Sequence, residues 1–199
     1  EDPGAFLARL RDGGLEGERS PWAPLAVTLS SASAGSHEEI TSGRLAVVDV
    51  AAQAMCELVE PADVVVDLAA APGGKTRTLL ARGVARHVVA LERNPTRSRR
   101  LAAGLRAAGR AGDVLVVRAD SMRPPLPRGA FRSVLLDAPC SGTGTLRKNP
   151  EIRWRLVPTD LSRLAVAQRA LLGAALDLCA PGGSVVYVTC SLEPEENEE

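Results

Sequence analysis

Aromatic side chains are scarce in this sequence of 199 residues, since Phe, Trp and Tyr together make up only 3%. Hydrophobic residues nevertheless reach 45%, so the core has to be built from aliphatic side chains. Lysine is also rare, because Lys75 and Lys148 are the only two among 24 basic residues and the others are arginine. The formal net charge is +0, which excludes attachment to nucleic acid or membrane by bulk charge alone but allows a local basic groove.

Long apolar runs and an export signal are also missing. No apolar run approaches the ~18 residues of a membrane span, and the first residues do not form a signal peptide. We therefore expect a cytoplasmic protein, whose thiols stay reduced. The four cysteines form no C-x-x-C pair, so we expect no metal site. In a reducing compartment, a cysteine is either a small apolar filler or a nucleophile.

Two parts of different character follow each other along the chain. Residues 1–41 are rich in Gly, Pro and Ser, so we expect an irregular N-terminal arm with one short strand at 25–29. From residue 42 the pattern becomes regular, and we expect a single domain over residues 42–199. A short strand at 45–48 and a helix at 50–59 are expected to open this domain.

Strands and helices then alternate. Apolar runs of strand length occupy residues 64–68, 87–91, 114–117, 133–137 and 184–188, with helices expected at 73–81, up to about 108, and at 161–178. Unbroken apolar strands that alternate with helices indicate an α/β fold with a parallel sheet and helices on both faces. Ligands of such sheets bind at the carboxyl ends of the strands, which is where a functional site is expected.

The residues after the first three of these strands suit a nucleoside-type ligand. Small residues with Gly73 and Gly74 follow the first strand, so a ligand can approach the backbone and the free N–H groups of a helix. The pattern is not that of a nucleoside triphosphate P-loop. Glu92 suits a ribose diol, and Asp120 can either meet a purine amine or cap a turn. Each feature alone also fits a plain turn or a solvated acid.

Two of the four cysteines lie just past the ends of the fourth and fifth strands. Because these strand ends are expected at one edge of the sheet, Cys140 and Cys190 are expected to converge on the same cleft. Cys56 and Cys179 lie on apolar faces instead, so we interpret them as structural. Cys190 is the expected nucleophile.

Four ordered motifs give this sequence a resemblance to a known family. The motifs are Asp67–Thr76, Asp137–Gly144, Arg147–Trp154 and Thr189–Asn197. With them the chain resembles the RNA cytosine-5 methyltransferases of the RsmB/NOL1/NOP2/Sun family, over roughly residues 42–197. A further upstream element of the family matches at Gly43, Asp49, Ala52 and Gln53, with Val48 where Gln is usual.

The resemblance implies a Rossmann-like, S-adenosylmethionine-dependent methyltransferase fold. The implied activity is methyl transfer from S-adenosylmethionine to C5 of a cytosine in RNA, with ribosomal RNA favoured over transfer RNA. In the family the sheet continues beyond the fifth strand with antiparallel strands. We therefore expect this chain to lack the C-terminal edge of the sheet.

The cofactor residues are also implied by the resemblance. They are Ala69, Ala70, Ala71, Pro72, Gly73, Gly74, Lys75, Glu92, Asp120 and Asp137. The loop at 69–75 is implied to cradle the methionine end, Glu92 to hold the ribose, and Asp120 to meet the adenine. The family usually has Asp at the position of Glu92 and Cys at the position of Ala69.

The implied mechanism uses both cysteines. C5 of cytosine is a poor nucleophile, and addition of the Cys190 thiolate to C6 turns the ring into an enamine whose C5 can attack the methyl sulfonium. Asp137 is implied to bond the N3/N4 edge of the base, and Cys140 to assist release. A nearby cation such as Lys75 would lower the pKa of the thiols, although a Lys75–Asp137 salt bridge is an alternative role for this lysine.

We expect the protein to be a monomer that binds RNA. Flipping a base costs a few kcal/mol, so single strands and loops are the expected targets. Trp154 is the best-placed stacking platform, and the neighbouring basic residues Arg147, Lys148 and Arg153 are expected to contact phosphates. A solvated charged face is the alternative for these residues.

Three other functions compete with this one. A non-catalytic RNA-binding scaffold could keep the same fold, but the intact Cys140 and Cys190 argue against it. A methyltransferase acting on an amine typically shows an Asn/Asp-Pro-Pro-Tyr type motif at the fourth strand, where this chain has Asp-Ala-Pro-Cys. DNA cytosine-5 enzymes carry their nucleophile in a Pro-Cys arrangement. They lack the Thr-Cys-Ser motif that ends the fifth strand of this chain.

Overall fold

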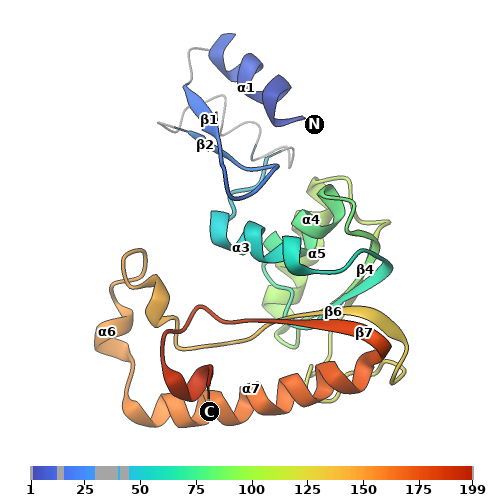
Figure 1. Ribbon diagram of the computed structural model, residues 1–199, viewed down its shortest axis with the longest axis vertical. Helices are drawn as coiled ribbons and strands as arrows, with labels where there is room; N and C mark the ends of the chain where they lie inside the picture. Colours follow the sequence, from blue (N-terminus) through green and yellow to red (C-terminus); the bar gives the residue numbers. More distant parts are fainter. Residues whose placement is uncertain (1, 13–15, 30–39, 41–44, 199) are drawn as a thin grey trace.

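The computed structural model describes residues 2–12, 16–29, 40 and 45–198 (Figure 1). Its centre is a five-stranded sheet in the order β5-β4-β3-β6-β7, and every neighbouring pair is parallel. The strands are β3 (Ala62–Asp67), β4 (Ala85–Leu91), β5 (Val114–Val117), β6 (Phe131–Asp137) and β7 (Cys179–Val188). The α/β class and the parallel sheet expected from the sequence are confirmed.

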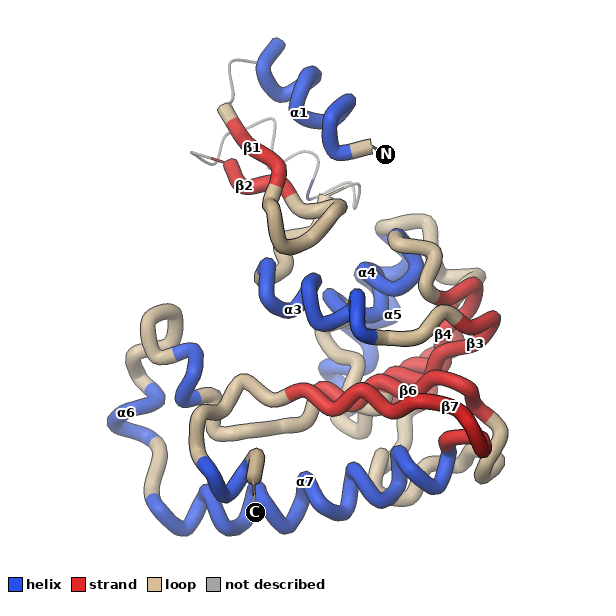
Figure 2. The backbone as a smooth tube through the Cα atoms, in the orientation of Figure 1, coloured by secondary structure: helices blue, strands red, loops and turns tan. Residues whose placement is uncertain are grey.

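Helices cover both faces of the sheet. The helices α4 (Gly74–Ala81) and α5 (Pro95–Ala107) lie on one side, and α7 (Pro158–Leu178) runs along β6 and β7 on the other (Figures 1 and 2). Because successive strand residues point to opposite faces, Val65 packs into the first layer and Val66 into the second. Both layers consist mainly of Leu, Val and Ala, as the shortage of aromatic residues requires.

Local sequence explains where the two longest helices begin. Asn94 caps α5, because its Oδ1 accepts hydrogen bonds from the N–H groups of Thr96 at 2.9 Å and Arg97 at 3.0 Å. Proline at the first position of both α5 and α7 has the backbone angle that a helix start needs. Asp160 adds an acidic group to the first turn of α7, where the helix dipole favours it.

The order of the strands creates a crevice at one point of the sheet. The chain builds β3, β4 and β5 outward in one direction and then returns to place β6 on the other side of β3. In doubly wound sheets, ligands bind outside the carboxyl ends of the strands where the order reverses in this way. The residues that follow β3 and β6 therefore flank the expected site.

The N-terminal segment differs from the expectation of an irregular arm. Helix α1 (Pro3–Asp12) is followed by β1 (Gly17–Arg19) and β2 (Val27–Leu29), which pair as an antiparallel ribbon. The strand expected at 25–29 is present in its last three residues. Residues 30–39 and 41–44, which include Gly43 of the upstream element, lie outside the described residues.

The sequence contains a start signal for α1, but the glycines and prolines that follow it are typical of an irregular segment. Asp2 Oδ2 accepts hydrogen bonds from the N–H groups of Gly4 at 2.8 Å and Ala5 at 3.1 Å, which is the bonding of a helix cap. The apolar side chains of α1 pack against the β1–β2 ribbon and form a small core. Figure 1 shows α1 and this ribbon apart from the main sheet.

The strand expected at 45–48 is wrong. These residues form a loop that leads into α3 (Val50–Met55), which continues as the short 3-10 helix η1 (Cys56–Leu58), so the helix expected at 50–59 is confirmed in two parts. Val47 is 83% exposed. Val47 and Val48 line a surface cleft, which explains an apolar run that joins no sheet.

Short helices lie in the loops after the last two strands. They are η2 (Thr143–Thr145) and α6 (Ile152–Arg155) after β6, and η3 (Pro194–Glu196) after β7. Within the described ranges, no helix is both long enough and apolar enough to cross a membrane.

Candidate functional site

A cleft of about 200 Å³ opens at the carboxyl ends of β3 and β6, where the strand order reverses. One wall comes from the loop that precedes α3, and the other from the loop between β3 and α4. Seven of the ten residues expected to bind a cofactor line it: Ala69, Ala70, Ala71, Pro72, Gly74, Lys75 and Asp137.

The loop between β3 and α4 is fixed from both sides. The Ser121 hydroxyl donates a hydrogen bond to the carbonyl oxygen of Leu68. Gly73, just before α4, has a φ of 105°, a left-handed conformation that strains residues with side chains. A Cβ at Gly73 would also lie 2.6 Å from Leu101 Cδ1 on α5. Gly73 thus allows the loop to turn tightly beneath the cleft.

Asp67 is a residue of this cleft that the sequence reasoning did not assign. Its side chain is fully buried, and its Oδ2 accepts a hydrogen bond from Thr76 Oγ1 at 2.6 Å. Its Oδ1 has no hydrogen-bond partner among the described residues. Burial raises the pKa of Asp67 to about 6. The signal that could have found it is an acidic residue that ends a buried strand directly before a glycine-rich loop.

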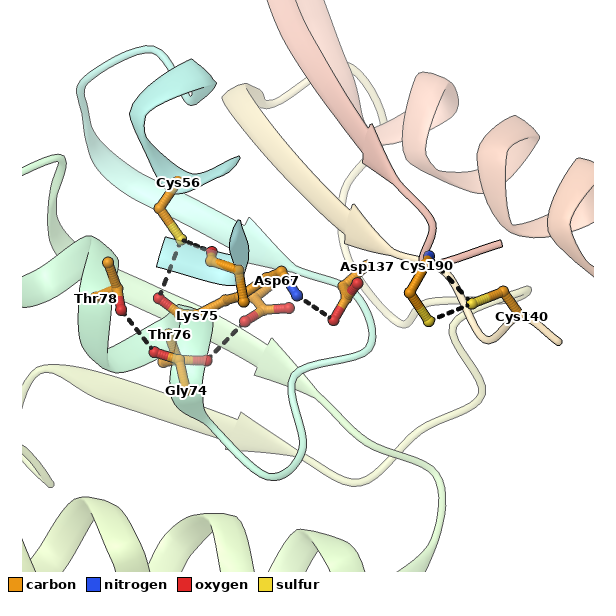
Figure 3. A network of polar contacts seen from close by, with 10 residues as sticks. Cys56, Asp67, Gly74, Lys75, Thr76, Thr78, Asp137, Cys140 and Cys190 are labelled. Atoms are coloured by element: carbon orange, nitrogen blue, oxygen red, sulfur yellow. Dashed lines mark hydrogen bonds and ion pairs between the residues drawn. The ribbon is translucent and has the colours of Figure 1, made fainter. Parts of the chain in front are cut away.

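Lys75 and Asp137 join the two sides of the cleft. Lys75 Nζ lies 2.6 Å from Asp137 Oδ2, and both side chains are partly buried. The salt bridge that the sequence allowed as an alternative role for Lys75 is therefore present. Figure 3 shows Lys75, Asp137, Cys190 and Cys140 in a row, so Asp137 stands between the cleft and the two thiols.

The structure brings Cys140 and Cys190 together, with 2.8 Å between their Sγ atoms (Figure 3). The hydrogen bond from Cys140 lowers the pKa of Cys190 to about 7, against opposing effects of burial and of Asp137. The same hydrogen bond, together with burial, raises the pKa of Cys140. The directions of these two shifts favour a thiolate on Cys190 over a thiolate on Cys140.

The other two cysteines lack this environment. Cys56 is fully buried, and burial raises the pKa of its thiol to about 12. Cys179 begins β7, at the opposite end of that strand from Cys190. Neither thiol shares the contact with Cys140 that lowers the pKa of Cys190.

Backbone contacts hold the two cysteine loops close to each other. The N–H of Gly144 donates to the carbonyl oxygen of Cys190 at 2.9 Å, and the N–H of Leu192 donates to Thr143 Oγ1 at 2.9 Å. A Cβ at Gly144 would lie 2.9 Å from that same Cys190 oxygen, so only glycine allows this approach.

Glu92 and Asp120 stand at the same edge of the sheet but do not line the cleft. Glu92 is buried, accepts a hydrogen bond from the N–H of Asn94 at 2.7 Å, and forms an ion pair with Arg97 at 3.0 Å. Asp120 Oδ1 accepts from the N–H of Met122 at 3.0 Å, which is the turn-capping role left open by the sequence. Their roles toward a cofactor stay predictions.

The residues expected to meet RNA are exposed, on the loop after β6 and on α6. Trp154 is 77% exposed, and the Arg153 guanidinium lies 5.6 Å from the centroid of its ring. Arg147 is also exposed, whereas Lys148 forms an ion pair with Asp49 at the start of α3. A second cavity of about 290 Å³ adjoins Cys140 and α6.

The sequence of this chain matches a family of known proteins. The sequence model of the family described as 16S rRNA methyltransferase RsmB/F matches residues 55–199. The ribosomal RNA small subunit methyltransferase B of Cronobacter sakazakii is 36% identical over 98% of this chain and 46% of its own length. That of Vibrio vulnificus is 38% identical over 79% of this chain and 37% of its own length.

A solved structure agrees with these sequence matches. A methyltransferase homolog protein from Pyrococcus horikoshii has a TM-score of 0.82 and 30% identity, over 98% of this chain and 63% of that one. The fold is therefore the Rossmann-like methyltransferase fold. The chain spans about half the length of the first of the curated relatives.

Proposed function

The chain belongs to the 16S rRNA methyltransferase RsmB/F family, and from this membership and its site we propose that it methylates C5 of a cytosine in ribosomal RNA. The observation that carries the proposal is the pair of thiols at 2.8 Å beside Asp137, at the end of a cleft. The names of the relatives support ribosomal RNA as the substrate.

The cleft suits S-adenosylmethionine as the methyl donor. The unpartnered Oδ1 of buried Asp67 can accept a hydrogen bond from a cationic ammonium group, and the small residues 69–74 leave room for a ligand against the backbone. Bound there, S-adenosylmethionine supplies a methyl group made electrophilic by its sulfonium. Asp67 and the loop at 69–75 would hold its methionine end.

Cys190 would make C5 of the cytosine nucleophilic. With a pKa of about 7, a large fraction of Cys190 is thiolate at neutral pH. The thiolate adds to C6 of the ring, and C5 gains the electron density that it needs to take a methyl group. Asp137, held by Lys75, would accept a hydrogen bond from the N4 amino group of the base.

Cys140 would assist the release of the product. After methylation a base removes the proton from C5, the electron pair re-forms the C5–C6 double bond, and Cys190 leaves as a thiolate. The Cys140 thiol would donate a hydrogen bond to that leaving sulfur, since the two sulfur atoms lie 2.8 Å apart. Because a hydrogen bond stabilises the thiolate more than the thioether, it favours cleavage of the C6–sulfur bond.

The exposed side chains after β6 would present the RNA to this site. Trp154 offers a stacking surface for a base, and Arg147 and Arg153 offer charge for phosphates. A cytosine has to be unpaired to reach Cys190, so a loop or a single strand is the expected target.

The direct test is analysis of the methylated nucleoside. The protein is incubated with S-adenosylmethionine and unmethylated 16S rRNA, and the digested RNA is examined by mass spectrometry. We expect 5-methylcytidine, its loss in Cys190→Ala, and its persistence in the matched control Cys179→Ala. A methyl group on another atom, or full activity of Cys190→Ala, would overturn the proposal. Transfer RNA in a parallel reaction tests the choice of substrate.

A further inference from the structure

Cys140 and Cys190 lie on two separate loops, and a single buried side chain contacts both loops. Glu196 belongs to η3, six residues after Cys190 in the sequence. Its side chain is 3% exposed. We propose that Glu196 is a positioning residue, whose carboxylate ties the Cys140 loop to the Cys190 loop and so sets the contact between the two thiols. This inference rests on the proposed function, in which that contact is the reacting centre.

The hydrogen bonds of Glu196 reach the residues directly after both cysteines. Its Oε1 accepts from the N–H of Ser141 at 2.9 Å, and its Oε2 accepts from the hydroxyl of Ser191 at 2.5 Å. The two serine hydroxyl oxygens lie 3.0 Å from each other. One carboxylate thus bridges the two loops within one residue of each sulfur.

Gln168 connects the carboxylate of Glu196 to α7, the long helix that packs against the sheet. Its Nε2, on α7, donates to Glu196 Oε1 at 2.8 Å and to the carbonyl oxygen of Pro139 at 2.9 Å. Pro139 precedes Cys140, so both neighbours of that cysteine are held. Gln168 is itself 3% exposed. The bridge is therefore anchored to α7 and not only to the side chains of the loops.

The position of Glu196 is itself fixed. The Tyr187 hydroxyl, on β7, donates to the carbonyl oxygen of Glu196 at 3.2 Å. The side chain of Asn197 donates to the carbonyl oxygens of Ser191 at 3.2 Å and Glu193 at 2.9 Å, which closes the chain back onto the Cys190 loop. These contacts fold the chain back on itself. Glu196 therefore lies close to the Cys190 loop, although it follows Cys190 in the sequence.

The charge of Glu196 suits this role. Burial by itself raises the pKa of the carboxyl group, but the hydrogen bonds from Ser141, Ser191 and Gln168 outweigh burial and lower it. The group is therefore ionised at neutral pH, and hydrogen bonds to an ionised acceptor are about twice as strong as neutral ones. A neutral side chain would hold the loops less tightly.

The direction in which the pKa of Cys190 shifts when Glu196 is replaced distinguishes a positioning role from a purely electrostatic one. The charged and titratable groups that act on Cys190 are Cys140, Asp137 and Lys75. Removal of a nearby negative charge alone lowers the pKa of a thiol or leaves it unchanged. Loss of positioning weakens the Cys140 hydrogen bond, which raises the pKa of Cys190.

The experiment measures the rate of alkylation of Cys190 by iodoacetamide as a function of pH, on the whole chain, with the modified peptide read by mass spectrometry. In Glu196→Ala the apparent pKa of Cys190 is expected to rise by about one unit or more, toward its ordinary value. Glu196→Gln keeps an acceptor for Ser141 and Gln168, so its profile is expected to lie closer to wild type. Glu198→Ala, which removes an exposed acid nearby, is the matched control and should change nothing.

A wild-type or lowered pKa of Cys190 in folded Glu196→Ala would overturn the proposal, as would a larger shift in Glu196→Gln than in Glu196→Ala. Folding is checked by circular dichroism and thermal unfolding. If Glu196→Ala does not fold, Ser191→Ala, which removes one hydrogen bond of the bridge, decides by the same criterion. The measurement uses neither RNA nor S-adenosylmethionine, so its failure and the failure of methyl transfer are distinguishable.

Discussion

Two chemically identical side chains at this site receive opposite properties from their surroundings. The hydrogen bond between the Cys140 and Cys190 thiols lowers the pKa of Cys190 to about 7 and raises that of Cys140. Because a thiolate and not a thiol attacks carbon, the difference supports the proposal that Cys190 is the nucleophile. In the proposed mechanism, Cys140 is the hydrogen-bond donor to the nucleophile Cys190, so the two cysteines act as a pair.

Removal of the donor should therefore slow the nucleophile. In Cys140→Ala the pKa of Cys190 is expected to rise toward 9.0, its ordinary value. The thiolate fraction at pH 7 then falls, and alkylation of Cys190 at that pH should slow by about tenfold or more. Cys140→Ser keeps a donor and should show a smaller effect, while Cys56→Ala serves as a control. An unchanged rate in Cys140→Ala would mean that the contact does not activate Cys190.

Asp67 predicts a pH dependence of stability with a definite sign. Its pKa is about 6 in the folded chain and 3.8 when exposed, so between these values the folded state binds the proton more tightly. The stability that Asp67 contributes is fully present below about pH 4 and is lost as the pH rises to about 6, on the order of 3 kcal/mol.

Replacement of Asp67 tests that sign. Compared with wild type, Asp67→Asn should become relatively more stable as the pH rises from about 4 to about 7, because it has no proton to lose. Urea denaturation at both pH values measures the difference in the free energy of unfolding. Asp63→Asn, an exposed position on the same strand, is the control. An identical pH dependence in wild type and Asp67→Asn would contradict the assignment.

At the scale of elements, sequence pattern predicts the sheet well and its surroundings less well. All five strands of the sheet lie within five residues of their expected bounds, because buried parallel strands are unbroken apolar runs. The run at 45–48 has the same pattern but lines a cleft instead, and pattern alone does not separate the two. Helix α1 is not predicted because its start signal is short and is followed by glycines and prolines.

The loop between β3 and α4 depends on Gly73. In Gly73→Ala the backbone is strained by the φ of 105° and the new Cβ meets Leu101, so the free energy of unfolding should fall by about 2 kcal/mol. Gly83→Ala is a matched control, since Gly83 has a φ of 69° but a Cβ at this position would meet nothing within 4 Å.

The comparison of the two variants separates a left-handed glycine in the cleft loop from one outside that loop. Calorimetric titration with S-adenosylmethionine should show affinity weakened by about tenfold in Gly73→Ala and unchanged in Gly83→Ala. Equal stability and equal affinity of the two variants would show that Gly73 is not needed to shape the cleft.

At the scale of the whole molecule, the site is assembled from segments that are distant in the sequence. Strand ends bring Asp67, Asp137 and Cys190 to one edge of the sheet, and this could be predicted because the order of elements fixes which ends are shared. The contacts of Glu196 and the Lys148–Asp49 ion pair could not, because they depend on how loops cross in space. The sequence therefore predicts which residues gather at the site, and the structure shows which contacts hold these residues in position.

Covalent trapping tests the central claim most directly. The protein is mixed with S-adenosylmethionine and ribosomal RNA that contains 5-fluorocytosine, whose fluorine cannot leave C5 as a cation, so the nucleophile stays bound to C6. We predict an adduct that survives denaturation, that maps to Cys190 by mass spectrometry, and that is lost in Cys190→Ala but retained in Cys179→Ala. An adduct on another residue, or one that persists in Cys190→Ala, would contradict the assignment of Cys190 as the nucleophile.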